Sequence, residues 1–233
     1  MVSKLARSFI LLLATSSAVT AAPTIAQTLI VDFPVNGRVV VQAREQIGKF
    51  PQMLFTSERT HKTLLLSSIE DPDKFLLPAA EDAPEFWPSL RFRVIHSPGF
   101  KSPIIMSVGL FTGGSDNAYF LTVFAEVLGR IVRLNQKPLF ANVQGGYYIG
   151  YLNKRLGYGL VAWDFIWEDG PHYSAHKYSI NIYRIVGARL KRILHTTSKK
   201  TYDSDKNADS LLELGIRVID QRNGIPRIKD TLN

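Results

Sequence analysis

The sequence predicts an all-β protein built from consecutive antiparallel hairpins, with one short helix near the C-terminus. Short runs rich in Val, Ile and aromatic residues recur at roughly eight to twelve residues, and Gly-, Pro- or Asn-containing turns separate them. Several of these runs alternate apolar and polar residues, as half-buried strands do. The stretch from 90 to 196 would supply two four-stranded meanders like propeller blades. No internal repeat decides between this arrangement and a sandwich or a single curled sheet.

The N-terminal part predicts a hairpin, a third strand and then an irregular connection. Residues 28–33 and 38–42 are β-rich and flank a break that contains Pro34 and Gly37. Residues 62–69 form the next candidate strand. Residues 70–89 contain four prolines among acidic side chains, and this composition excludes a regular helix or a central strand through most of the segment.

The strand pattern is stronger after residue 89. Leu90, Phe92 and Val94 alternate with two arginines, which predicts a half-buried strand. Further strands are expected at 103–111, 119–127, 130–134, 139–143, 147–152, 159–167, 178–182 and 189–196, the last of which also has spacing that suits a helix. A turn is expected at 113–117.

The helix is expected near residue 210. Ser210 and Glu213 have the spacing of a capping box, and Gly215 is placed to end a helix of barely two turns. Residues 216–219 would then form a last strand, and 223–233 a polar tail.

The first 22 residues have the layout of a cleaved secretory signal peptide. Lys4 and Arg7 precede an apolar run at 8–14, and small residues follow up to Ala22. We therefore expect residues 23–233 to be one exported all-β domain, secreted or periplasmic. The chain contains no cysteine, so disulfides, thiolate metal sites and a cysteine nucleophile are excluded. No later stretch of the sequence is apolar enough to anchor the chain in a membrane.

The positive charge is concentrated toward the C-terminus. The formal net charge is +8, and residues 184–233 carry 11 basic and six acidic side chains, against 15 and 14 in residues 23–183. Such a run is most often a solvated face, but it would also attract an anionic envelope component. Export argues against nucleic acid as the partner.

The aromatic stretch 145–183 is the best candidate for a binding surface. Seven of the nine tyrosines and two of the three tryptophans lie in it. Strand alternation would place Trp163, Phe165 and Trp167 on one face, either as core or as an open platform for a sugar ring or an apolar protein patch. The candidate binding residues are Tyr147, Tyr148, Tyr151, Trp163, Asp164, Trp167, His172, Tyr173 and His176.

The same stretch suggests two other kinds of site. Acids and histidines between Asp164 and His176 would serve a secreted hydrolase, although no local catalytic motif supports one. His172 and His176 beside Glu168 and Asp169 would suit a metal ion, but a third fixed ligand is missing from the pattern. The acidic run from Asp203 to Asp209 resembles an EF-hand loop only at its start.

The sequence therefore favours an exported, non-catalytic binding protein over an enzyme, with no predicted cofactor or metal. Its partner would be a glycan, an anionic envelope component or another exported protein. The hydrolase and the periplasmic metal-binding protein are the alternatives.

Overall fold

The computed structural model describes residues 22–46, 49–66, 89–96, 99–111, 118–136, 139–142, 144–167, 171 and 174–218. Residues 1–21 of the proposed signal peptide, the proline-rich connection up to residue 88 and the expected turn at 113–117 lie outside the described residues. So do His172, Tyr173, Glu168 and Asp169.

Three antiparallel sheets, each in simple meander order, make up the fold. The N-terminal sheet contains β1 (Thr24–Phe33), β2 (Gly37–Gln46), β3 (Lys49–Ser57) and β4 (Thr63–Leu66). The middle sheet contains β5 (Ser89–Ile95), β6 (Ile104–Phe111), β7 (Ala118–Val127), β8 (Arg130–Arg133) and β9 (Leu139–Asn142). The C-terminal sheet contains β10 (Gly146–Asn153), β11 (Gly157–Phe165), β12 (Tyr178–Val186) and β13 (Arg189–Thr197). The prediction of consecutive antiparallel meanders is confirmed.

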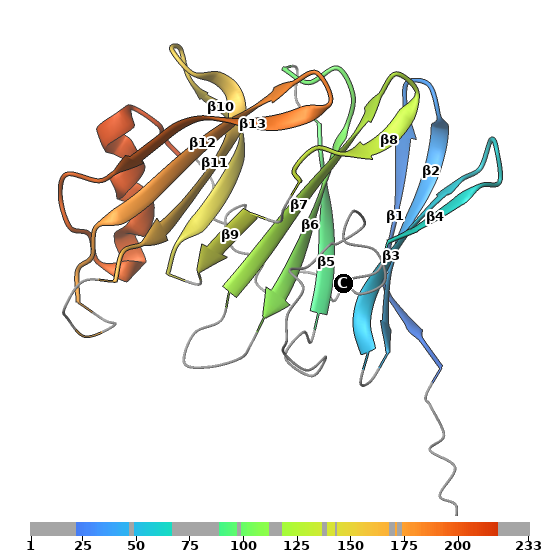
Figure 1. Cartoon of the computed structure of the whole chain (residues 1–233), viewed down its shortest axis with the longest axis horizontal. Helices are drawn as coiled ribbons and strands as arrows, with labels where there is room; N and C mark the ends of the chain where they lie inside the picture. The colour runs from blue at the N-terminus through green and yellow to red at the C-terminus, as the bar shows by residue number, and fades with distance from the viewer. Residues whose placement is uncertain are drawn as a thin grey trace, which may run out of the picture.

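The sheets lie side by side in chain order (Figure 1), and apolar side chains fill the space between each pair. One cluster joins the N-terminal and middle sheets, where the rings of Phe55 and Phe124 lie 5.2 Å apart. A second cluster joins the middle and C-terminal sheets. Ile105 belongs to the first cluster and its neighbour Ile104 to the second. The middle sheet is therefore buried on both faces, which explains why β6 is apolar at nearly every position rather than at every second one.

The outer strand of the middle sheet is interrupted, and one side chain bridges the interruption. β8 pairs with one half of β7 and β9 pairs with the other half. Between them, Asn135 accepts a hydrogen bond from the backbone N–H of Val123 (2.8 Å) and donates one to the carbonyl of Leu121 (3.0 Å). The amide of a buried asparagine thus replaces the missing backbone groups of the ladder.

The 3₁₀ helix η3 (Ser204–Leu214) covers the outer face of the C-terminal sheet. Gly215 ends it in the left-handed conformation, as predicted, and its N–H donates to the carbonyl of Leu212. The expected capping box is wrong: the helix starts six residues before Ser210, whose hydroxyl donates to the carbonyl of Asn207. No helix among the described residues is long and apolar enough to cross a membrane.

The strand prediction needs correction at two places. Residues 216–218 are not a strand, because Ile216 packs under η3 as part of the apolar cluster there. β3 was not predicted at all, since Pro51 interrupts its β-rich pattern. The strand expected at 189–196 is confirmed as β13, which alternates between more and less exposed positions, and the helical alternative for this segment is wrong.

Candidate functional site

A cleft of about 440 Å³ opens between the middle and C-terminal sheets, at the end of the molecule where the hairpin turns lie. Its walls come from the β5–β6 loop, the C-terminal end of β7, the start of β11 and the end of β12. Apolar side chains form much of its lining: Phe100, Ile104, Ala125, Val127, Leu128 and Ile185. A concave, mostly apolar site of this size is typical of small-ligand sites.

Tyr158 forms the aromatic end of the cleft. Its ring lies edge-on to Phe100, with centroids 6.1 Å apart, and to its cross-strand partner Tyr151 at 5.3 Å. The β5–β6 loop lies directly on this ring, because a Cβ added at Gly99 would be 2.1 Å from the Tyr158 Cγ. A glycine at position 99 therefore allows the loop to close one side of the cleft.

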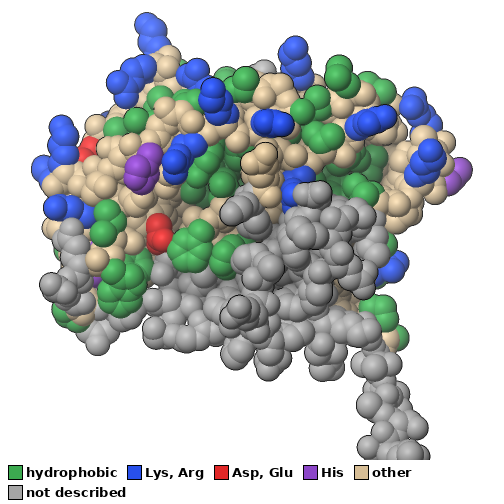
Figure 2. Space-filling view, in the orientation of Figure 1, with side chains coloured by type: hydrophobic (Ala, Val, Ile, Leu, Met, Phe, Trp, Pro, Cys, Tyr) green, Lys and Arg blue, Asp and Glu red, His purple; other side chains and the backbone are tan. Residues whose placement is uncertain are grey.

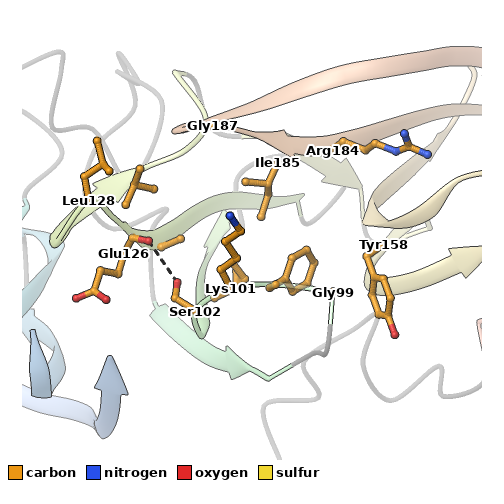
Figure 3. A pocket seen from close by; sticks show the side chains of 13 residues that line it. Gly99, Lys101, Ser102, Glu126, Leu128, Tyr158, Arg184, Ile185 and Gly187 are labelled. Atoms are coloured by element: carbon orange, nitrogen blue, oxygen red, sulfur yellow. Dashed lines mark hydrogen bonds between the residues drawn. The ribbon is translucent and has the colours of Figure 1, made fainter. Parts of the chain in front are cut away.

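The charged side chains that line the cleft place little negative charge in its interior. The Glu126 carboxylate points away from the cleft (Figure 3) and accepts hydrogen bonds from the backbone N–H groups of Val35 (2.8 Å) and Asn36 (2.6 Å). The Arg184 guanidinium donates to the carbonyl of Leu156 in the β10–β11 turn. Lys101 is exposed at the rim, and among the described residues no ion pair involves it. The cleft thus combines an apolar floor with a cationic rim.

Two of the nine predicted binding residues, both aromatic, belong to the apolar clusters of the core. Tyr147 is fully buried between the middle and C-terminal sheets. Trp163 lies under η3, where its indole N–H donates to the Asn207 side chain at 2.9 Å. Trp163 also fills the space above Gly146, because a Cβ there would lie 2.5 Å from the indole ring.

Burial also keeps two tyrosine hydroxyls, those of Tyr147 and Tyr178, from acid–base chemistry. Burial raises the pKa of Tyr147 to about 12, and its hydroxyl has no hydrogen-bond partner among the described residues. Burial, followed by the charges of Asp164 and Asp203, raises the pKa of Tyr178 to about 12. Both phenols are therefore neutral at physiological pH.

The other predicted residues that the structure describes fall at two opposite ends of the C-terminal sheet. Tyr148 and Tyr151 lie near the cleft, and the Tyr148 hydroxyl donates to the carbonyl of Tyr151 at 3.5 Å. At the far end, exposed Trp167 packs on Phe165 with ring centroids 5.3 Å apart. Tyr151 pairs with Tyr158 on β11, and the strand from Tyr158 to Phe165 spans roughly 23 Å at 3.3 Å per residue, so Tyr151 lies far from the Trp167 end. The structure does not bring them together into one platform.

His176 and Asp164 belong to the far end. The His176 ring is buried, 5.1 Å from the Phe165 ring, and its backbone pairs with that of Tyr202. Asp164 precedes Phe165 on β11. Within the described part of the chain, no group of three or more His, Asp or Glu side chains could hold a metal ion.

The sequence interpretation did not identify Phe100, Lys101 or Tyr158 as site residues. Tyr158 was counted with the aromatic stretch, but its position beside the β5–β6 loop depends on how two sheets pack. A possible signal was the SPGFKSP segment, which places an aromatic and a basic side chain between two prolines.

These features define an all-β protein of stacked antiparallel meanders with a cleft between two of the sheets. Comparison with protein-family models, with curated proteins and with solved structures finds no match.

Proposed function

We propose that this protein is an exported, non-catalytic binding protein that takes an amphiphilic anion in the cleft between the middle and C-terminal sheets. The cleft is the observation that carries the proposal, because it joins an apolar floor to the Lys101 ammonium at its rim. The apolar body of a ligand would lie against Ile185 and Phe100. Its anionic group would reach Lys101.

The arrangement of charges favours binding over hydrolysis at this site. A hydrolase that uses acids or histidines requires one of these groups within hydrogen-bond reach of the reacting atoms. The one carboxylate among the lining residues, Glu126, is turned away and engaged by the β1–β2 turn. Export rests on the basic, apolar and small residues of the first 22 positions.

The test is a titration with the amphiphilic anion 1-anilinonaphthalene-8-sulfonate, followed by the fluorescence of this probe, with dodecanoate as a competing amphiphilic anion. Lys101→Gln should weaken binding by about fivefold to tenfold, as expected for the loss of one charge-assisted contact. Lys154→Gln is the matched control, because Lys154 is exposed on a neighbouring turn outside the cleft. An equal effect of both substitutions, or no binding of either anion, would refute the proposal.

A further inference from the structure

Three hairpin turns, one from each sheet, carry an exposed apolar side chain at or beside the tip. Val35 lies in the β1–β2 turn, Leu128 in the β7–β8 turn and Val186 at the β12–β13 turn. Their side chains are 51%, 98% and 56% exposed. Figure 1 places all three turns along the same edge of the molecule. Their exposure thus requires an explanation outside the core.

The three turns form one continuous surface. Val35 packs against the β7–β8 turn, where a Cβ added at Gly129 would lie 3.0 Å from the Val35 Cγ1. The Asn36 side chain donates to the Gly129 carbonyl at 3.0 Å. Leu128 and Gly187 line the same cleft, which connects the β7–β8 turn to the β12–β13 turn.

Leu128 is the most informative of the three residues. It has a positive φ of 49° and is followed by Gly129 at 73°, so both central residues of this two-residue turn are left-handed. Asn-Gly is the favoured sequence for such a turn, and a leucine is disfavoured in this conformation. At 98% exposure, Leu128 gains almost nothing from burial that would offset this strain. A strained, exposed leucine points to a contact with something outside the molecule.

Cationic side chains surround these apolar tips. The exposed cations on this edge are Arg59, Lys101, Arg130, Lys154, Arg155 and Arg189. Two of the nearby acids are engaged: Glu58 pairs with Arg38 at 3.4 Å, and Glu126 binds the β1–β2 turn, whereas Asp32 is exposed at the end of β1. Figure 2 shows Lys and Arg side chains along this upper edge, with apolar side chains between them.

We propose that this edge, the turn face, docks on the surface of an anionic phospholipid bilayer. The cations would contact lipid phosphates, and the apolar tips would enter the boundary between headgroups and acyl chains. A soluble polyanion would be attracted by the cations alone and would not account for Leu128. The inference goes beyond the proposed function, because it holds whether or not the cleft takes a ligand.

The test measures binding of the full chain to vesicles of phosphatidylcholine alone and of phosphatidylcholine mixed with phosphatidylglycerol. We expect binding to the mixed vesicles only. Removing three cations in Arg59→Gln/Arg130→Gln/Arg189→Gln should weaken it on the order of 100-fold, from about fivefold per charge. The control Lys199→Gln/Lys200→Gln/Lys206→Gln removes the same charge from exposed positions near η3, and it should change binding much less. The apolar N-terminal run is common to all variants, so differences between them report on the turn face.

Leu128→Asn separates a role in folding from a role in docking. It introduces the favoured Asn-Gly turn, so the melting temperature should stay the same or rise while vesicle binding falls by about tenfold. Leu212→Asn, at a half-exposed position on η3, is the matched control and should leave binding unchanged.

Several results would overturn the inference. These are equal binding to neutral and mixed vesicles, equal effects of the two triple variants, and unchanged binding by Leu128→Asn. Full competition by the soluble acidic glycan polygalacturonate would also overturn it and indicate a glycan instead. The Arg59, Arg130 and Arg189 positions do not line the cleft, so dodecanoate binding by that triple variant tests the cleft separately.

Discussion

The two outer sheets of the stack differ in what their outward faces carry. On the N-terminal sheet, the outward side of β1 carries Thr28, Ile30 and Asp32, all exposed. On the C-terminal sheet, the outward side of β11 carries Val161 and Trp163, both buried under η3. The exposed outward side of β1 can face solvent, whereas the apolar outward side of β11 needs a cover. The short C-terminal helix provides that cover.

The cover is held by polar contacts as well as by packing. The Glu213 carboxylate accepts hydrogen bonds from the backbone N–H groups of Lys199 (2.7 Å) and Lys200 (3.0 Å), and from the Tyr202 hydroxyl (2.9 Å). Asn153 in the β10–β11 turn donates to the carbonyl of Leu214 at 2.9 Å. The helix is therefore held both by the turn between the first two strands of the C-terminal sheet and by the residues that follow its last strand.

The largest expected effect comes from weakening this cover at Leu211, an η3 side chain that is fully buried against the C-terminal sheet. Leu211→Ala should lower the free energy of unfolding by about 2–5 kcal/mol, the usual range for a buried leucine. Urea unfolding followed by tryptophan fluorescence measures it, since Trp163 lies in the same cluster. Ile30→Ala, on the exposed face of the N-terminal sheet, should change stability by less than about 0.5 kcal/mol. Equal effects at both positions would show that the two outer faces do not differ as described.

A smaller effect is expected at Glu213. Burial alone would raise the pKa of this carboxyl, but the N–H groups of Lys199 and Lys200 and the Tyr202 hydroxyl outweigh it and lower the pKa. A lowered folded-state pKa means that the carboxylate stabilises the fold above its unfolded pKa, and that this stability is lost as the pH falls through the folded value. Because solvent screens this carboxylate, Glu213→Gln should lower the free energy of unfolding at pH 7 by about 0.5–1 kcal/mol.

The pH dependence distinguishes this role from a general loss of packing. The difference between wild type and Glu213→Gln in urea unfolding should shrink as the pH drops below the ordinary range for a carboxyl. Asp205→Asn is the control, because Asp205 is exposed in the first turn of η3. A difference that persists unchanged into strong acid would contradict the proposed contacts.

The contrast between the outer sheets also shows what local sequence patterns can predict. Hairpins with clear turns, such as the one across Leu128–Gly129, were predicted almost to the residue, because their pattern and turn chemistry lie close together in the chain. β3 was missed because Pro51 disrupts the pattern locally, while pairing with β2 and β4 keeps the strand in place. The predicted helix began too far along the chain, because the position of η3 depends on its packing against β11 and β12 and not on a local capping motif.

The candidate site was less accessible to sequence reasoning than the fold. The aromatic stretch is rich in tyrosine and tryptophan, as noted from the sequence. The alternation of residues along a strand, however, does not distinguish a strand face buried between two sheets from a face open to solvent. The cleft requires the β5–β6 loop to meet Tyr158, 58 positions after Phe100. The turn face likewise gathers cations from all three sheets, whereas the linear charge distribution pointed to the C-terminal quarter alone.

The smallest expected effect at neutral pH comes from removing one buried phenol hydroxyl at each of the two interfaces of the C-terminal sheet. Tyr147 lies against the middle sheet and Tyr178 against η3, and neither hydroxyl has a hydrogen-bond partner among the described residues. Replacing either with Phe removes a buried unpaired polar atom, so the change in unfolding free energy at pH 7 should be neutral or stabilising by up to about 1 kcal/mol.

At high pH the same variants should diverge from wild type. Burial raises the pKa of both phenols to about 12, from an ordinary value of 10.0. Because the folded pKa is the higher one, each phenol leaves stability intact below pH 10 and contributes a loss of stability as the pH rises from about 10 to 12. Tyr147→Phe and Tyr178→Phe should each make alkaline unfolding less steep, as followed by circular dichroism. If Tyr178→Phe has no such effect while Tyr147→Phe does, water reaches the phenol beneath η3. The helix then covers one face of the C-terminal sheet less tightly than the middle sheet covers the other face.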